Sequence, residues 1–254
     1  MRRNSSKFAL LMGTAALGAL FSAPTALASF HENLIREVHE GPASNGDYVE
    51  LQAYSAGQNL VNGKHIVTFD AGGGPLTDYT LNHDVSNGAN QATILIANAP
   101  SVNGVTPDFV AGNGATGAGN LNVDNTGGTV CYTDSSVTVA LDCVAFDHAN
   151  DVNPFTVKAF NPPQFGSPFI LPGASLDGNS LIRGISKACA TSLDKADDTN
   201  SAADFTVGTG SPRNNSATPT ETPCSTSAKK KCKKKKHHSA YSAKKKKCKK
   251  KKHH

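Results

Sequence analysis

Short segments in which apolar and polar residues alternate, or in which β-branched residues cluster, recur along this chain and are typical of β-strands. Clusters of Gly, Asn, Asp and Pro separate them and predict turns. About eight short strands joined by polar turns predict an antiparallel β-sandwich or barrel. One short helix is predicted around Thr191–Ala196. The predicted strands are Asn33–Val38, Asp47–Tyr54, His65–Asp70, Ala92–Ala97, Thr129–Tyr132, Val137–Phe146, Thr156–Phe160 and Ser180–Ile185.

The alternation also predicts which side chains share a face, because successive residues of a strand point to opposite sides. In the second predicted strand, Val49 and Leu51 point into the core. In the first predicted strand, strict alternation places Leu34, Arg36 and Val38 on one face and the residues between them on the other.

The composition changes this picture mainly through the distribution of charge. The chain has 254 residues, of which 18% are charged, with 23 Gly and no Trp, which excludes a coiled-coil or long-helix protein. Its net charge is only +5, yet residues 8–228 hold seven basic and all 20 acidic residues, a net charge of −13. The chain is therefore an acidic body with a basic N-terminus and a strongly basic C-terminus.

The N-terminus has the form of a secretory signal peptide. Arg2, Arg3 and Lys7 precede an apolar run from Phe8 to Phe21, and the small residues Ala26 and Ala28, on either side of Leu27, form a cleavage pattern. The alternative is an uncleaved signal anchor, which the shortness of the apolar run disfavours. We therefore predict that residues 1–28 are removed and that the protein is secreted, extracellular or attached to the cell surface.

Six cysteines fit an oxidising compartment. Cys131 and Cys143 flank a predicted hairpin, so we expect a disulfide between them. By elimination Cys189 would then pair with Cys224. The alternative leaves Cys189 free and buried, because spacing alone does not fix the connectivity.

Three separated motifs resemble the lamin-tail domain family as it occurs in secreted bacterial proteins. Leu34–Val38 followed by Asp47–Leu51 is similar to the family's "I-x-E-V … E/D-[FY]-V-E-L". Asp177–Arg183 resembles "D-G-x-S-L-x-R", and Ala203–Phe205 with Pro212–Asn215 resembles "x-D-F … P-x-P-G-x-x-N". The motifs occur in the family's order.

This resemblance implies a fold and a class of function. The fold it implies is an immunoglobulin-like antiparallel β-sandwich, with Glu50 pairing with Arg183 at the rim. It also implies an extracellular, non-enzymatic module, often an accessory to other domains, without catalytic residues or cofactor.

The C-terminus is an internal repeat rich in Lys, Cys and His. The segment 227–238 recurs at 242–254, and like charges without core-forming residues predict a disordered tail. The stretch from Asn214 to Ser227 is rich in Thr, Ser and Pro and indicates a linker. The predicted organisation is a signal peptide (1–28), a sandwich (29–218), a linker (219–228) and the tail (229–254).

The tail has three interpretations. It binds polyanions such as envelope polymers, acidic polysaccharide, anionic lipid or, without sequence specificity, nucleic acid; or it is a solvated tail, folded back on the acidic body. In the third it captures a metal through Cys232, Cys248 and its histidines, which the surrounding lysines oppose. Neighbouring lysines also favour reactive thiols, and hence intermolecular disulfides through Cys232 and Cys248. The predicted polyanion-binding residues are Lys229, Lys230, Lys231, Lys233, Lys234, Lys235, Lys236, Lys244, Lys245, Lys246, Lys247, Lys249, Lys250, Lys251 and Lys252.

Motifs that carry catalysis are absent from the sequence: it has no G-x-S-x-G, no H-E-x-x-H and no P-loop. The acidic loop with Asp194, Asp197, Asp198 and Asn200 has oxygen ligands for calcium but not EF-hand spacing, so a solvated acidic turn is the favoured interpretation. We therefore expect a binding or structural module that lacks enzymatic activity, a cofactor and a metal. The alternative is a secreted hydrolase or nuclease, or its accessory, with a site in the acidic loops.

Overall fold

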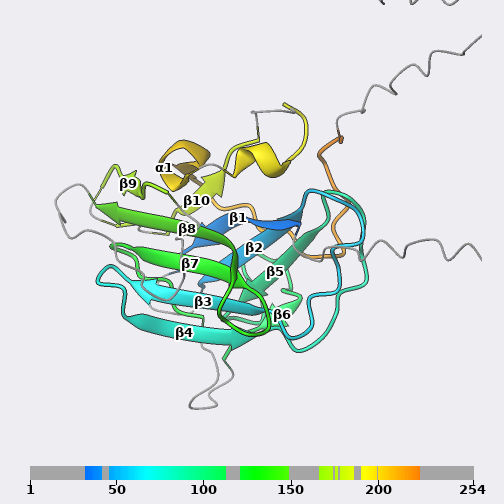
Figure 1. Cartoon of the computed structure of the whole chain (residues 1–254), viewed down its shortest axis with the longest axis horizontal. Coiled ribbons are helices and arrows are strands. Elements are labelled where there is room, and N and C mark those ends of the chain that lie inside the picture. Colours follow the sequence, from blue (N-terminus) through cyan, green and yellow to red (C-terminus); the bar gives the residue numbers. More distant parts are fainter. Residues whose placement is uncertain are drawn as a thin grey trace, which may run out of the picture. The chain divides into compact units, whose positions relative to one another are not determined.

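The computed structural model describes residues 32–41, 46–112, 121–148, 166–173, 175–176, 178–185, 190–198 and 200–223 (Figure 1). The predicted signal peptide, the predicted strand Thr156–Phe160 and the lysine-rich tail lie outside these residues. Cys189 and Cys224 also lie outside them, so their pairing stays a prediction. Among the described residues, no helix is long and apolar enough to cross a membrane.

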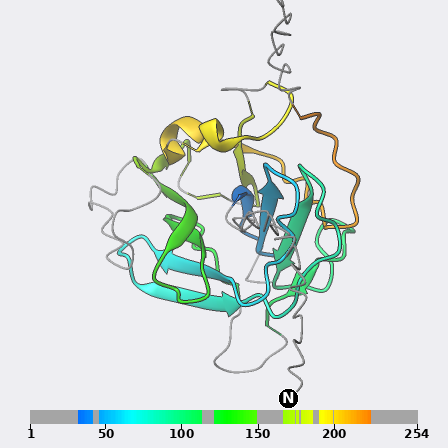
Figure 2. The same ribbon diagram turned by 45° about the vertical axis from the view of Figure 1, so that its right-hand side comes forward.

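The described residues form an all-β sandwich of two sheets that pack face to face (Figures 1 and 2). The first sheet has the order β11 (Phe205–Gly208), β10 (Ser180–Arg183), β1 (Asn33–His39), β2 (Tyr48–Ala53), β5 (Thr93–Ala97), β6 (Phe109–Val110). The second sheet has the order β4 (Pro75–Thr80), β3 (His65–Asp70), β7 (Gly128–Thr133), β8 (Ala140–His148), β9 (Phe169–Leu171). Most neighbouring strands are antiparallel, as predicted, but the edge pairs β5–β6 and β8–β9 are parallel, so both sheets are mixed.

Seven of the predicted strands are present with small shifts in their ends, namely β1, β2, β3, β5, β7, β8 and β10. The sequence analysis missed β4, β6, β9 and β11. β6 and β9 have two and three residues, which is too short for a periodic pattern to show. β4 is an edge strand whose residues are mostly exposed, so it has no apolar face to recognise.

The predicted helix is displaced toward the C-terminus. A 3-10 turn occupies Lys195–Asp197, and the one-turn helix α1 spans Ser201–Asp204. The hydroxyl of Ser201 accepts a hydrogen bond from the backbone N–H of Ala145 at 2.9 Å, so α1 is attached to β8.

The core lies between the two sheets and takes side chains from the inward face of each strand. Val49 and Leu51 are buried in it, as the alternation predicted, together with Ile66 and Val144 from the second sheet. The buried side chains of β1 depart from the prediction, because Ile35 and Val38 both belong to this core although they are three residues apart.

A β-bulge in β1 explains that departure. Ile35 pairs with Leu51 and Glu37 pairs with Glu50, so Arg36 is an extra residue without a cross-strand partner. An extra residue reverses the side on which later side chains fall. The prediction that Leu34, Arg36 and Val38 share one face is therefore wrong.

The predicted disulfide between Cys131 and Cys143 is confirmed. The two residues are directly opposite each other in the ladder of β7 and β8, with Cα atoms 4.1 Å apart. Their sulfur atoms lie in a small buried cluster with Val67 and Phe69, on the side of the second sheet away from the main core.

Arg183 does not pair with Glu50 as the sequence analysis expected. Its guanidinium is buried between the sheets, where Nη2 donates to the carboxylate of Asp142 at 2.7 Å. Nε donates to the carbonyl of Ile35 at 2.8 Å, and the guanidinium lies 4.6 Å from the ring centre of Phe205. Since Arg183 lies in β10 and Asp142 in β8, their ion pair connects the two sheets.

We predict that Arg183→Met lowers the free energy of unfolding by about 3–5 kcal/mol, because it leaves Asp142 buried without its counter-charge. The double variant Arg183→Met/Asp142→Leu should recover only part of that loss, because the backbone N–H and carbonyl of Ile35 lose their side-chain partners. Urea denaturation of the three proteins measures both effects. Lys195→Met, at an exposed position, is the control, and a loss no larger than that of the control would contradict the prediction.

Replacing Cys131 and Cys143 together by Ala should lower the free energy of unfolding by about 2–3 kcal/mol, since the bridge closes a short loop in the unfolded chain. Thermal denaturation of the wild type with and without reductant should show the same difference. Peptide mapping without reduction should recover the bridge, and finding both thiols free in the exported protein would count against it.

Candidate functional site

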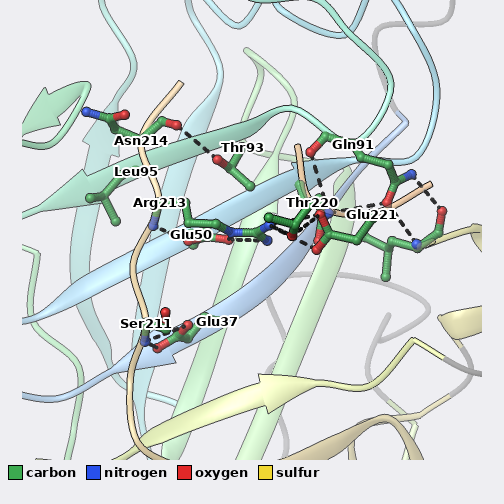
Figure 3. Close-up of polar contacts among 12 residues, drawn as sticks. Glu37, Glu50, Gln91, Thr93, Leu95, Ser211, Arg213, Asn214, Thr220 and Glu221 are labelled. Atoms are coloured by element: carbon green, nitrogen blue, oxygen red, sulfur yellow. Dashed lines mark hydrogen bonds and ion pairs between the residues drawn. The ribbon is translucent and has the colours of Figure 1, made fainter. Parts of the chain in front are cut away.

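The segment that follows β11, residues 209–223, is here called the C-terminal strap. It runs along the outer side of the first sheet, away from the second sheet (Figure 2, orange). The backbone N–H of Ser211 donates to Glu37 of β1 at 3.1 Å, and that of Arg213 donates to Glu50 of β2 at 2.6 Å (Figure 3). Asn215 donates to the carbonyl of Thr93 in β5 at 2.9 Å. The strap therefore crosses three neighbouring strands.

Because of these contacts, the part of the strap from Asn214 onward is not the free linker that its composition predicted. Asn214 and Asn215 are hydrogen-bonded to the sandwich, and Thr222 donates its backbone N–H to the carbonyl of Thr191. Gly210 lies so close to β2 that a Cβ at this position would overlap the hydroxyl of Tyr48. Residues 209–223 are thus part of the folded body.

Glutamates of the first sheet hold the strap because an irregular segment has backbone N–H groups without a ladder partner. The alternation of β2 places Glu50 on the face opposite the core, and the bulge places Glu37 beside it. Both side chains are almost completely buried. Glu37 also accepts a hydrogen bond from the hydroxyl of Tyr48.

Arg213 forms ion pairs with Glu50 of the sheet and with a further carboxylate, that of Glu221 in the strap. Its Nη2 lies 3.0 Å from Glu50, and its Nη1 lies 2.9 Å from Glu221 of the strap (Figure 3). Burial raises the pKa of Glu50 to about 7, although the charge of Arg213 opposes it. Burial acts in the same direction on Glu221, but the hydrogen bonds and charge of Arg213 outweigh it and lower the pKa of Glu221 to about 2.

A pocket of about 380 Å³ lies between the strap and the first sheet. It combines two guanidinium groups, three carboxylates, two hydroxyl-bearing side chains and one apolar side chain. This set can bind polar oxygen-rich molecules, since it offers both strong donors and strong acceptors. The lining residues are Arg36, Glu37, Glu50, Ile182, Ser211, Arg213, Thr220 and Glu221.

A serine and a histidine approach each other next to this pocket. The hydroxyl of Ser180 lies 3.0 Å from Nδ1 of His39 and 3.3 Å from the hydroxyl of Tyr48. Such a contact is the first geometry to test for nucleophilic catalysis. Ser180 has no exposed surface, however, so no substrate reaches its hydroxyl in this structure. Its contacts instead join β10, β1 and β2.

The acidic loop is built differently from the solvated turn that the sequence favoured. Asp194 caps the 3-10 turn by accepting from the N–H of Ala196, and Asn200 caps α1 by accepting from the N–H of Ala203. Asp197 is buried, and Asp198 lies 3.6 Å from Arg183. Within the described ranges, no group of three or more His, Cys, Asp or Glu side chains is placed so that it could hold a metal ion.

The residues that sequence analysis singled out for binding lie elsewhere. All 15 tail lysines, Cys232 and Cys248 are outside the described residues, so the structure does not test them. The pocket residues were not predicted as a site. One signal of the site was present in the sequence, because Glu50 is a charged residue in a strand otherwise rich in apolar side chains. Its partner Arg213 is 163 residues away, so the sequence pattern did not connect the two.

No protein-family model, curated protein or solved structure matches this chain. The resemblance to the lamin-tail family therefore stays a prediction. The structure itself defines the class of fold: a β-sandwich of two mixed sheets, in which the C-terminal strap covers the outer face of the first sheet.

The pKa of Glu50 predicts a specific pH dependence. Between its ordinary value of 4.5 and about 7, the folded protein keeps a proton that the unfolded chain has released. The stabilising effect of protonated Glu50 is therefore fully present below pH 4.5 and is lost as the pH rises from 4.5 through about 7. Glu50→Gln removes the effect, so wild type should lose on the order of 1–3 kcal/mol relative to this variant between pH 5 and pH 8.

Urea denaturation at several pH values measures this difference. Glu221→Gln is the matched control, because a carboxylate with a pKa of about 2 keeps its charge throughout that range. Its stability difference from wild type should stay constant. Parallel pH profiles for wild type and Glu50→Gln would mean that Glu50 is ionised throughout.

Proposed function

We propose that this chain is a secreted, non-enzymatic binding or structural module, in which the lysine-rich tail tethers the β-sandwich to anionic polymers of the cell envelope or to other polyanions. One observation carries the proposal: 15 lysines fall within positions 229–252, whereas residues 8–228 have a net charge of −13. An acidic body repels polyanions, so attraction to them resides in the tail.

The N-terminal pattern of basic residues, an apolar run and the small residues Ala26 and Ala28 supports export. The disulfide between Cys131 and Cys143 supports it, because such bonds persist in oxidising compartments. Cys232 and Cys248 supply further thiols through which copies of the protein can be linked to one another.

We also propose that the sandwich is immunoglobulin-like and related to the lamin-tail family. The arrangement of the motif segments supports this. Leu34–Val38 and Asp47–Leu51 fall on β1 and β2, Ser180–Arg183 forms β10, and Phe205 begins β11. These strands are neighbours in one sheet although they are far apart in sequence. The last motif, Pro212–Asn215, lies in the strap that crosses the same sheet.

The proposal predicts that polyanion binding depends on the tail and weakens steeply with salt. Neutralising about six to ten phosphates of a DNA duplex makes the affinity fall about 10³–10⁵-fold between about 50 and 200 mM salt, because condensed counterions are released. Envelope polymers should show a decline of the same sign. The measurement is a salt titration of binding to isolated envelope and to duplex DNA.

Two variants of the full chain sharpen this test. Replacing all 15 tail lysines by Gln should abolish binding, whereas shuffling residues 227–254 should leave it unchanged, since charge rather than order is recognised. Binding that survives the Lys→Gln replacement, or that ignores salt, would place the site on the sandwich and overturn the proposal.

A further inference from the structure

The outer face of the second sheet carries apolar side chains that are buried although they lie on the outside of the sandwich. They belong to a cluster separate from the main core, and none of them is more than 6% exposed. The outer face of a sandwich sheet is usually solvated and polar. Something therefore covers these side chains, here called the outer cluster: Val67, Phe69, Cys131, Cys143 and Ala145.

The described part of the chain supplies little apolar cover. Within that part, Val137, in the turn between β7 and β8, is the one partly buried hydrophobic residue that packs against the outer cluster. A single valine is too small to cover side chains that extend over three neighbouring strands, β3, β7 and β8. The rest of the cover comes from another segment of the chain or from another molecule.

The connection between β8 and β9 is long enough to supply it. The two strands are parallel neighbours, so the chain has to turn back between them. Because β9 begins opposite Phe146, near the end of β8, the return needs only about 8 Å. The segment 149–165 can extend over about 55 Å. Most of this length is thus available for a path over one face of the second sheet.

The outer face is the one open to such a path. Val144, Phe146 and Leu171 of β8 and β9 point into the main core, where the first sheet packs against the inner face. On the outer side, β3 is two strands away from β8, a distance of about 10 Å that the segment can cross and return. A path along the free edge of β9 would leave the outer cluster uncovered.

The sequence of the segment suits an apolar surface. Phe155, Val157 and Ala159 alternate with Thr156 and Lys158. Such alternation places the three apolar side chains on one side of an extended segment and the polar ones on the other.

We propose that residues 149–165 dock on the outer cluster, with Phe155 and Val157 packed over Cys131 and Cys143, and so shield the disulfide from reductants. A disulfide is reduced when a thiolate attacks one of its sulfur atoms, so a cover that excludes the thiolate keeps the bond intact. This role does not depend on the proposed tethering by the tail.

The test is the rate at which dithiothreitol reduces the bond between Cys131 and Cys143 in the exported protein, followed by alkylation and mass spectrometry. One thiolate of the reagent forms a mixed disulfide, and its second thiol then releases both cysteines as thiols while the reagent closes into a cyclic disulfide. Phe155→Ser/Val157→Ser should be reduced at least about tenfold faster than wild type, because opening no longer has to displace the cover. An unchanged rate would overturn the proposal.

The matched control is Thr156→Ser/Lys158→Ser, which makes two substitutions by serine on the opposite side of the same segment. Its bond should be reduced at the rate of wild type, and equal acceleration would overturn the assignment to Phe155 and Val157. Amide exchange at Val144, which is buried in the main core, should be the same in both variants. If exchange there rises by the same factor as reduction, the segment stabilises the whole fold instead of covering the bond, and the proposal is wrong.

Protein concentration distinguishes the segment from a second copy of the chain. Cover by residues 149–165 of the same chain makes the reduction rate independent of protein concentration. Reduction that slows as the concentration rises would assign the cover to a second copy and overturn the proposal.

A spectrum of the wild-type protein decides if Phe155→Ser/Val157→Ser does not fold. NMR should then show nuclear Overhauser contacts between the ring protons of Phe155 and the methyl groups of Val67. Their absence would contradict the docking of the segment on the outer cluster.

Discussion

The ion pair between Arg183 and Asp142 supports the most irregular part of the first sheet. The ladder between β1 and β10 ends at Glu37 and Ile182, so the backbone groups of Ile35 have no partner in it. The carboxylate of Asp142 accepts from the N–H of Ile35 at 2.5 Å, and Arg183 donates to its carbonyl. Two side chains thus replace a missing strand. The bulge begins at the next residue, so the position of Arg36 depends on the same pair.

The strap adds a third layer to a fold that otherwise has two. The outer face of a sandwich sheet is usually exposed and polar. Here that face carries Glu37 and Glu50, and it is covered by a segment without regular structure. The glutamates do for the strap what a neighbouring strand would do, because their oxygens accept its N–H groups. Buried charge on this face therefore follows from the need to pair an irregular backbone.

The sequence predicted the central strands, the core positions of β2 and the cross-strand disulfide, because each depends on local alternation or on neighbouring strands. It did not predict the bulge, because Leu34 and Val38 are both apolar and fit strict alternation, which hid the three-residue spacing of the core residues Ile35 and Val38. It assigned Arg183 to Glu50 because both were expected at the rim. The strap was missed because a Thr-, Ser- and Pro-rich composition is the same for a linker and for a segment fixed by contacts with distant residues such as Glu50.

The bulge has a consequence for how this chain can vary. If residue 36 were absent, Ile35 opposite Leu51 and Glu37 opposite Glu50 would be consecutive pairs of a regular ladder, with both faces unchanged. For the sheet, Arg36 is an insertion of one residue, and its deletion would leave the pairing of β1 with β2 intact. Selection for a well-formed sandwich would favour that deletion or ignore it. The persistence of this residue in a lineage would therefore record selection on what its side chain contacts, independently of selection on the fold.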